Sequence, residues 1–230
     1  MTTHEIVLDA GVNLPACRYE AVGVELPPVL VLAHGAGAGQ DHPFMRRVAA
    51  GLSERGVTVV TFDFPYMARG RRVPDRMPVL ETSLVAAVEW ARRLAPGALV
   101  FAGGKSMGGR VASRVAADQP SGLGTVAGLV LLGYPLHPPR RPDQLRVDHL
   151  PRLRLPVLVV QGTRDEFGSP AELRPWLAQI PAAVTLHEVE DGDHSLAVPR
   201  RVDPGGDRFR AALDAVAQWI TLTAGAAGPA

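Results

Sequence analysis

The sequence contains very little cysteine and lysine. Among its 230 residues there is one cysteine, Cys17, and one lysine, Lys105. A single cysteine excludes a disulfide within the chain and gives no sign of an oxidising compartment. Arginine supplies the remaining positive charge, as is typical of GC-rich coding sequences. We therefore interpret the single lysine as a consequence of composition.

The sequence also lacks a charge imbalance and long apolar runs. Its formal net charge is +1 at pH 7, which argues against a general attraction to nucleic acid or to an anionic membrane. The longest apolar runs have the length of strands, so we expect no membrane span. The first residues do not place a basic stretch before an apolar one, so we expect no signal peptide and a cytoplasmic location. A monomer is the default expectation, with a dimer as the alternative.

Apolar strands alternate with helical patterns along the whole chain. Strands are expected at 5–10, 16–20, 29–33, 57–62, 98–102, 126–132, 156–160 and 184–189, and helices at 43–55, 80–94, after residue 106, and at 170–180 and 209–220. Continuously apolar strands separated by helices indicate a parallel sheet that is covered on both faces. We therefore predict an α/β fold with a mostly parallel twisted sheet of about seven to eight strands. A single domain is expected over residues 1–223, followed by a disordered tail at 224–230.

The most informative motif is the Gly-x-Ser-x-Gly pattern at residues 104–108. It follows a predicted strand and precedes a predicted helix, so Ser106 is expected on a sharp, strained turn with its hydroxyl exposed. Such a turn is typical of the nucleophile of serine hydrolases. A phosphate-binding loop is the alternative, but it needs a glycine six residues before Lys105, where the sequence has Leu99. Nucleotide binding is therefore rejected.

A serine hydroxyl needs a base, normally histidine, and a carboxylate that orients the imidazole. In this architecture the expected chain order is serine, acid, histidine. Asp165 follows one predicted strand and His194 follows the last one, so Ser106, Asp165 and His194 are the predicted catalytic residues. The acids that remain as alternatives are Glu166, Asp191 and Asp193. The last two lie too close to His194 in sequence to reach its far nitrogen easily.

Catalysis of this kind also needs two N–H donors for the developing oxyanion. One is predicted to be the backbone N–H of Met107. The other is expected from a glycine-rich loop after an earlier strand, with Ala36 as the first choice and Gly35 as the second. His34 is interpreted as a structural histidine that braces this loop, and Asp41 as the N-cap of the next helix.

Five strings of residues together resemble a known family. They are His34-Gly35-Ala36-Gly37-Ala38-Gly39, Phe62-Asp63-Phe64-Pro65-Tyr66, Gly104-Lys105-Ser106-Met107-Gly108-Gly109-Arg110, Gly133-Tyr134-Pro135-Leu136-His137-Pro138 and Gln161-Gly162-Thr163-Arg164-Asp165. The chain resembles the α/β-hydrolase superfamily, more narrowly its dienelactone-hydrolase-related branch. Within that branch it is similar to the small KAN-like group, named after the hydrolase-like domain of the KAT8 regulatory NSL complex subunit 3.

This resemblance implies the α/β-hydrolase fold and a triad on Ser106, Asp165 and His194. True dienelactone hydrolases use a cysteine nucleophile, so the serine argues against transferring their substrate to this chain. Members of the narrower group have poorly defined substrates. The eukaryotic relative acts as a subunit of a complex, so a scaffold or interaction module that kept the fold is an alternative function.

The residues that shape the substrate site are harder to predict. A short lid-like segment is expected at 134–153, stiffened by its prolines into a fixed wall. The side chains assigned to substrate binding are Phe64, Tyr66, Met67, Arg69, Tyr134 and His137, and Met77 is expected to line the same pocket as the first three. Ordinary core packing explains the aromatic residues equally well.

Arginines are also expected near the mouth of the site. They are Arg69, Arg71, Arg72, Arg76, Arg140 and Arg141. Fixed guanidinium groups suit a carboxylate or phosphate, which suggests a weak preference for acidic esters. A solvated arginine-rich surface is the simpler interpretation in a chain that uses arginine for almost all of its positive charge.

Together these features predict a hydrolase of carboxylic esters with small or medium acyl groups, of class EC 3.1.1. The reaction would pass through an acyl-enzyme on Ser106. No metal and no cofactor is implied, because no His, Cys and Glu residues have ligand spacing. The expected partner is a small-molecule ester. A thioesterase or peptidase with the same triad is the alternative among enzymes.

Overall fold

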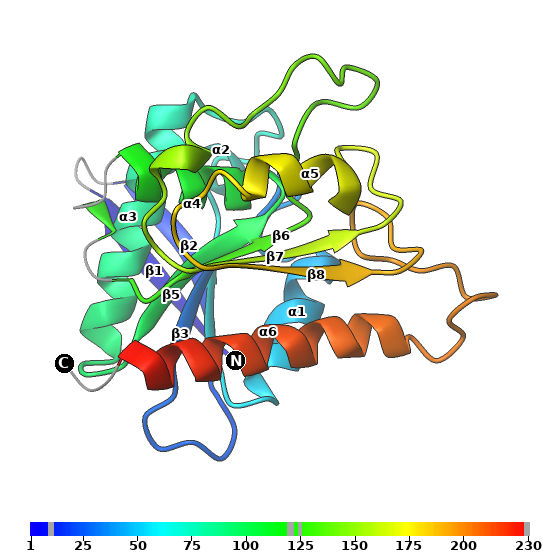
Figure 1. Ribbon diagram of the computed structural model, residues 1–230. Coiled ribbons are helices and arrows are strands. Elements are labelled where there is room, and N and C mark those ends of the chain that lie inside the picture. Colours follow the sequence, from blue (N-terminus) through cyan, green and yellow to red (C-terminus); the bar gives the residue numbers. More distant parts are fainter. Residues whose placement is uncertain (9–11, 119–121, 124–125, 228–230) are drawn as a thin grey trace.

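The computed structural model describes residues 1–8, 12–118, 122–123 and 126–227. Its eight strands form one sheet with helices packed on both faces (Figure 1). The strands are β1 (Thr2–Leu8), β2 (Val12–Tyr19), β3 (Val29–Ala33), β4 (Thr58–Phe62), β5 (Val100–Lys105), β6 (Leu129–Leu132), β7 (Val157–Gly162) and β8 (Val184–Val189). This architecture confirms the predicted fold class.

The strand order in the sheet is β1-β2-β4-β3-β5-β6-β7-β8. Strands β1 and β2 pair antiparallel, as do β2 and β4, whereas all later pairs are parallel. The expected first strand ran to residue 10, and its last two residues lie outside the described ranges. Because β5 is central, residues that follow it lie near the middle of the edge where the parallel strands end.

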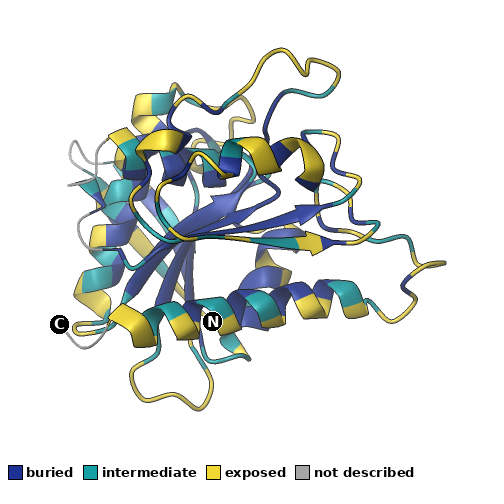
Figure 2. Ribbon diagram, in the orientation of Figure 1, coloured by how far each residue is buried: buried dark blue, intermediate teal, exposed yellow. Residues whose placement is uncertain are grey.

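The helices divide into two layers according to which face of the sheet they cover. One layer holds α2 (Pro65–Ala68), α3 (Met77–Leu94), α4 (Met107–Asp118) and α5 (Pro170–Leu177), and the other holds α1 (Pro43–Ser53) and α6 (Asp207–Ala227). Alternation along β3 shows how the sheet serves both layers. Val29 and Val31 pack with the first layer, while Leu30 and Leu32 pack with the second. The five central strands β3 to β7 are accordingly buried along their whole length, whereas the edge strands β1 and β8 are largely exposed or half-buried (Figure 2).

Several element boundaries differ from those expected. Helix α6 continues to Ala227, so the tail expected from residue 224 does not begin there, and residues 228–230 lie outside the described ranges. The strand expected at 126–132 is shorter and begins at Leu129. In the lid-like segment, the helical structure is a single 3₁₀ turn at Leu150–Arg152. Pro151 lies inside this turn, and the residue after it, Leu153, has extended backbone, so no longer helix forms.

The N-cap of α1 also differs from the prediction. His42 occupies the cap position, and its Nδ1 accepts a hydrogen bond from the Phe44 N–H at 3.2 Å. Asp41 lies one residue too early, because Pro43 takes the first helical position. Within the described ranges, none of the helices combines the length and apolar character that a membrane span requires.

Candidate active site

Ser106 lies on a strained turn between β5 and α4. Its φ of 51° is in the left-handed region, which a residue with a side chain rarely adopts. The glycines on either side are required by close backbone contacts. A Cβ on Gly108 would lie 2.3 Å from the carbonyl oxygen of Ala33, and one on Gly104 would lie 2.6 Å from the same oxygen. The turn therefore presents Ser106 at the sheet edge, as the motif predicts.

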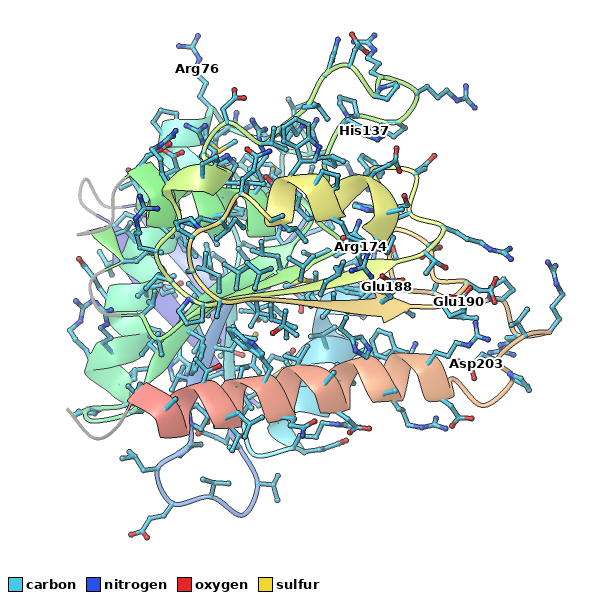
Figure 3. The ribbon with its side chains drawn as sticks, in the orientation of Figure 1. Arg76, His137, Arg174, Glu188, Glu190 and Asp203 are labelled. Atoms are coloured by element: carbon cyan, nitrogen blue, oxygen red, sulfur yellow. The ribbon has the colours of Figure 1, made fainter. Side chains whose placement is uncertain are left out.

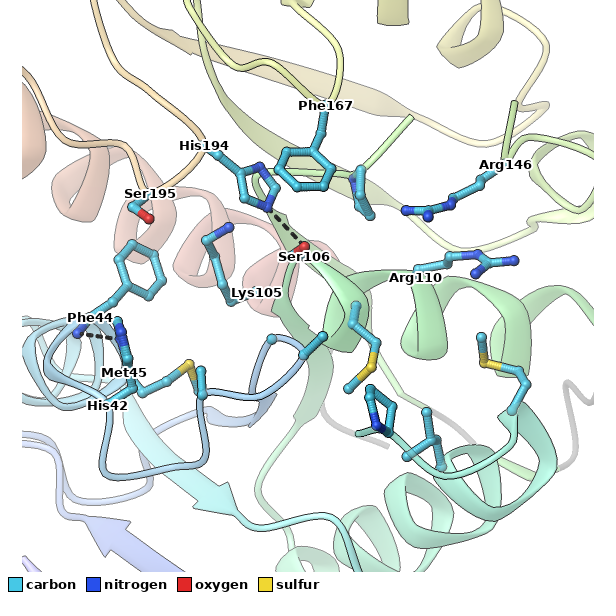
Figure 4. A pocket seen from close by; sticks show the side chains of 18 of the residues that line it. His42, Phe44, Met45, Lys105, Ser106, Arg110, Arg146, Phe167, His194 and Ser195 are labelled. Atoms are coloured by element: carbon cyan, nitrogen blue, oxygen red, sulfur yellow. Dashed lines mark hydrogen bonds between the residues drawn. The ribbon is translucent and has the colours of Figure 1, made fainter. Parts of the chain in front are cut away.

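Ser106, His194 and Asp165 form one chain of hydrogen bonds. The Ser106 Oγ lies 2.9 Å from His194 Nε2, shown as a dashed line in Figure 4. On the other side of the ring, Nδ1 lies 2.9 and 2.8 Å from the two carboxylate oxygens of Asp165. With its proton on Nδ1, the imidazole donates to Asp165 and accepts from the Ser106 hydroxyl. In this tautomer His194 can take the hydroxyl proton.

Asp165 is buried and held from two further directions. Gln161 Nε2 donates to Oδ2 at 2.8 Å, and the Phe167 N–H donates to Oδ1 at 2.8 Å. The same Gln161 amide donates to the Gly168 carbonyl and accepts from the Tyr134 N–H. This amide was missed by sequence reasoning. Its only signal was a polar residue at the end of an otherwise apolar strand.

The competing acids are occupied elsewhere. Asp191 forms ion pairs with Arg164 and Arg208. Asp193 accepts two backbone N–H groups of its own turn, at 2.7 and 2.9 Å. Glu166 is exposed. Among the four acids considered, only Asp165 is hydrogen-bonded to His194.

The residues predicted to bind the oxyanion lie beside Ser106. Met107, Ala36 and Gly35 all line the same cavity as the serine. Met107 is the first residue of α4, so its N–H has no partner inside the helix. Among the described residues, no acceptor is bonded to the N–H of Met107 or of Ala36. Two donors are therefore free to face a substrate oxygen.

His34 braces the glycine-rich loop, as predicted. Its Nδ1 donates to the Gly35 carbonyl at 2.7 Å, and its Nε2 accepts from the Phe64 N–H at 3.1 Å. Burial lowers its pKa, with the Gly35 carbonyl and Asp63 acting in the opposite direction. A neutral imidazole with both nitrogens occupied serves structure and does not act as a second base.

The cavity beside Ser106 has a volume of about 490 Å³. It is lined by Gly35, Ala36, Ala38, His42, Phe44, Met45, Pro74, Asp75, Met77, Leu80, Lys105, Ser106, Met107, Arg110, Pro135, Arg146, Phe167, His194 and Ser195. The lid-like segment contributes Pro135 and Arg146. Volume and lining suit a small or medium molecule with an apolar part.

None of the six side chains assigned to substrate binding is among the residues that line this cavity, which corrects that prediction. Phe64 and Tyr66 are fully buried in the core. The Tyr66 hydroxyl accepts from the Gly37 N–H at 3.1 Å and thereby supports the loop. Tyr134 is also buried, and its hydroxyl donates to the Arg146 carbonyl at 2.6 Å. Their aromatic character therefore reflects packing.

The other three members of that set lie outside the cavity as well. Met67 is half-buried under the glycine-rich loop, where its methyl lies close to Gly39. Arg69 is exposed. His137 is buried in the lid-like segment with its Nε2 3.5 Å from Glu172 (Figure 3). Of the side chains expected in the pocket, only Met77 lines it.

The arginines expected at the mouth lie on the surface instead. All six are exposed, and Arg76 points away from the molecule (Figure 3). Arg71 pairs with Asp75 at 2.6 Å. The two arginines that do line the cavity, Arg110 and Arg146, were not singled out from the sequence. Arg110 stands four residues after Ser106 on α4, a helical spacing that could have identified it.

Lys105 occupies an unusual place for a charged residue. It is 7% exposed, and its Nζ is buried without a hydrogen-bond partner among the described residues. Burial lowers its pKa from 10.5 to about 8, with Asp165 and Asp193 acting in the opposite direction. The single lysine thus lies next to the proposed nucleophile. Its interpretation as a consequence of composition did not predict this position.

Comparison with known proteins agrees with this geometry. The family described as "Alpha/beta hydrolase domain" matches residues 27–221. The chain belongs to this alpha/beta hydrolase family. The match covers the whole parallel part of the sheet and every residue of the Ser106–His194–Asp165 chain.

Several solved structures are similar to this hydrolase. A dienelactone hydrolase from Anabaena variabilis is 22% identical, over 96% of this chain and 98% of that chain, with a TM-score of 0.70. Est1E from Butyrivibrio proteoclasticus is 16% identical, over 97% and 99%, with a TM-score of 0.72. XC6422 from Xanthomonas campestris, a serine hydrolase without a lid, is 22% identical, over 95% and 94%, with a TM-score of 0.70. At these identities the likeness shows the shared fold.

Proposed function

We propose that this alpha/beta hydrolase cleaves carboxylic esters of small or medium acyl groups, with Ser106, His194 and Asp165 as its catalytic triad. The single observation that supports this most is the continuous hydrogen-bonded chain from the serine hydroxyl to the buried carboxylate, which opens into a cavity. A strained φ at the serine is a second support, because such strain is kept where a function needs it.

The reaction begins with attack of Ser106 Oγ on the ester carbonyl carbon. His194 Nε2 takes the hydroxyl proton, and Asp165 stabilises the imidazolium that forms. Collapse of the tetrahedral intermediate breaks the ester C–O bond, and the same Nε2 gives its proton to the leaving alkoxide. An acyl-enzyme remains on Ser106.

The second half of the reaction uses water in place of the serine. His194 removes a proton from water, the hydroxide attacks the acyl carbon, and the proton returns to Ser106 Oγ as the carboxylic acid leaves. In both halves the carbonyl oxygen gains negative charge. The N–H groups of Met107 and Ala36, with Gly35 beside them, are the donors proposed to hold it.

Hydrolysis of a series of p-nitrophenyl esters tests this function. Turnover of short or medium acyl esters is expected, with kcat lowered about 10,000-fold by Asp165→Asn and at least as much by Ser106→Ala. Asp214→Asn, an exposed aspartate on α6, is the matched control and should leave kcat unchanged. If the protein hydrolysed thioesters or peptides but no esters, the triad would stand and the proposed ester substrate would be wrong. A folded protein that turns over none of them would favour the scaffold function.

The finer assignments belong to the same proposal. They are membership of the KAN-like group, class EC 3.1.1, a monomeric state and a cytoplasmic location. The strings of residues around the glycine-rich loop and the serine turn support the first of them. Analytical ultracentrifugation and cell fractionation check the oligomeric state and the location.

A further inference from the structure

Two guanidinium groups stand in the cavity without a carboxylate partner. Arg110 comes from α4, and Arg146 comes from the loop between β6 and β7; both line the cavity beside Ser106 (Figure 4). The Arg110 Nε is buried and has no hydrogen-bond partner among the described residues. Within the same residues, neither arginine forms an ion pair with an acid. The pair is therefore uncompensated within the described chain.

The charged groups nearest to this pair do not neutralise it. Burial lowers the pKa of Arg110, and the charges of Arg146 and Arg114 lower it further. Tyr134 and Glu81 act in the opposite direction. The Tyr134 hydroxyl donates to the Arg146 carbonyl, and the Glu81 Oε1 accepts from Arg114 Nε at 2.9 Å. Both arginines are half-buried. Like charges that are partly removed from water without a counter-ion are unfavourable, and proteins normally pair them. An anion from solution would relieve this imbalance.

The other charged side chains of the cavity lie apart from the pair. Asp75 is the one carboxylate among the described lining residues. Its Oδ1 pairs with Arg71 at 2.6 Å, and its Oδ2 is buried without a hydrogen-bond partner among the described residues. It is not among the groups that shift the pKa of Arg110 or Arg146. Lys105 lies on the opposite side of Ser106 from the two arginines (Figure 4). The two guanidinium groups thus lie together on one side of the nucleophile.

We propose that Arg110 and Arg146 form a carboxylate-binding subsite, so that the preferred substrates are esters that carry a second, ionised carboxyl group. This inference rests on the proposed ester hydrolysis. A planar guanidinium donates two parallel hydrogen bonds to a carboxylate, and two such groups hold it in a fixed orientation. The residues differ from the surface arginines that the sequence suggested for acidic esters.

Matched pairs of esters that differ by one charge test the subsite. The first pair is p-nitrophenyl hydrogen adipate and its methyl ester, with the charge in the acyl part. The second is 4-acetoxybenzoate and its methyl ester, with the charge in the leaving group. In at least one pair, kcat/KM should be about 10-fold or more higher for the anionic member, after subtraction of spontaneous hydrolysis.

Variants assign that preference to the arginines. Arg146→Gln and Arg110→Gln should each reduce the ratio of anionic to neutral kcat/KM about 10-fold. Arg141→Gln is the matched control, because Arg141 lies in the same loop as Arg146 but is exposed and outside the cavity. Circular dichroism reports whether each variant is folded. If Arg110→Gln does not fold, the result for Arg146→Gln decides.

Three results would overturn the subsite. One is equal kcat/KM within both ester pairs while neutral esters are hydrolysed, which leaves the proposed function intact. Another is a preference that survives both arginine variants and disappears in Lys105→Met. If no ester is hydrolysed, the proposed function fails, and calorimetry with free adipate still tests the subsite. Binding that Arg146→Gln abolishes would support it, and binding that is absent or unchanged in that variant would refute it.

Discussion

The ring of Phe167 stacks on the imidazole of His194, with the ring centroids 4.0 Å apart and an interplanar angle of 27°. The backbone of the same residue donates to Asp165 Oδ1 at 2.8 Å. One residue therefore fixes both members of the His194–Asp165 pair, the carboxylate through its N–H and the imidazole through its ring. Packing of this kind keeps the imidazole aimed at Ser106.

Loss of the aromatic ring should slow catalysis. Phe167→Leu keeps the backbone hydrogen bond to Asp165 but removes a ring contact worth about 0.5–1.5 kcal/mol, so kcat should fall about 3- to 10-fold. Phe167→Tyr keeps the stacking and should retain most of the activity. Steady-state kinetics on one neutral ester compares the two variants. Equal kcat in wild type and Phe167→Leu would show that the ring does not position His194.

Gln161→Leu should weaken both the fold and the reaction. The amide donates to Asp165 Oδ2 at 2.8 Å and to the Gly168 carbonyl at 2.7 Å. Leucine leaves these buried acceptors unsatisfied, so the free energy of unfolding should fall by about 1–3 kcal/mol, and kcat should fall with it. Urea denaturation and ester kinetics measure the two effects.

The control for that variant is Gln179→Leu, which replaces an exposed glutamine at the end of α5. Its free energy of unfolding should change by less than about 0.5 kcal/mol. If Gln161→Leu were as stable and as active as this control, the polar network around Asp165 would have no energetic role.

Lys105 predicts an unusual dependence of stability on pH. The pKa of its side chain is about 8 in the folded protein, compared with 10.5 for a lysine in the unfolded chain. Between these values the unfolded chain holds a proton that the folded protein has released, so the free energy of unfolding should rise as pH increases from about 8 to 10.5. Below pH 8 the folded protein retains the buried ammonium at a cost on the order of 3 kcal/mol.

Lys105→Met removes this titration. At pH 7 the variant should be more stable than the wild type, and its stability should not show the rise above pH 8 that Lys105 causes. Because the chain has one lysine, lysine labelled with ¹³C at Cε gives a single NMR resonance from which the pKa is read directly. A measured pKa near 10.5 would contradict the buried, unpartnered state of the ammonium.

Gly108, two residues after Ser106, should not tolerate a methyl group. In Gly108→Ala the new Cβ would meet backbone atoms of Ala33 at 2.3 and 2.6 Å. The backbone must shift, so we expect a loss of about 1–3 kcal/mol in the free energy of unfolding and displacement of the Met107 N–H. Thermal denaturation checks this against Gly225→Ala, where nothing lies within 4 Å and helix propensity favours alanine. Equal stability of the two variants would contradict the close approach.

Sequence patterns predicted most of the architecture and the central side chains. Apolar runs identified the parallel strands, because burial on both faces leaves few polar positions in the central ones. Ser106 was identified by a local motif whose glycines are required by local contacts. Asp165 and His194 were found because the fold places the ends of parallel strands at one edge of the sheet.

The cavity lining could not be predicted in the same way. Tyr66 and Arg146 show why: the first is aromatic but fills the core, and the second is charged but lines the cavity. Which of them faces the substrate depends on how the loops between strands fold over the sheet edge. No periodic pattern in the sequence records that arrangement.

The ends of helices α1 and α6 could not be predicted from apolar periodicity, because single residues decide where a helix begins and ends. The N-cap of α1 is His42 and not the predicted Asp41, because Pro43 occupies the first helical position. At the other end of the chain, small residues were interpreted as a tail, yet α6 continues to Ala227. Alanine has the highest helix propensity, so the helix continues where nothing stops it.

The most direct test of the central claim is covalent labelling of Ser106. The protein is exposed briefly to a fluorophosphonate probe and examined by intact and peptide mass spectrometry, beside Ser106→Ala and the exposed Ser195→Ala. One adduct is predicted, on Ser106, present in the wild type and in Ser195→Ala and absent from Ser106→Ala. A folded wild-type protein without an adduct, or with an adduct on another residue, would contradict an activated nucleophile at Ser106.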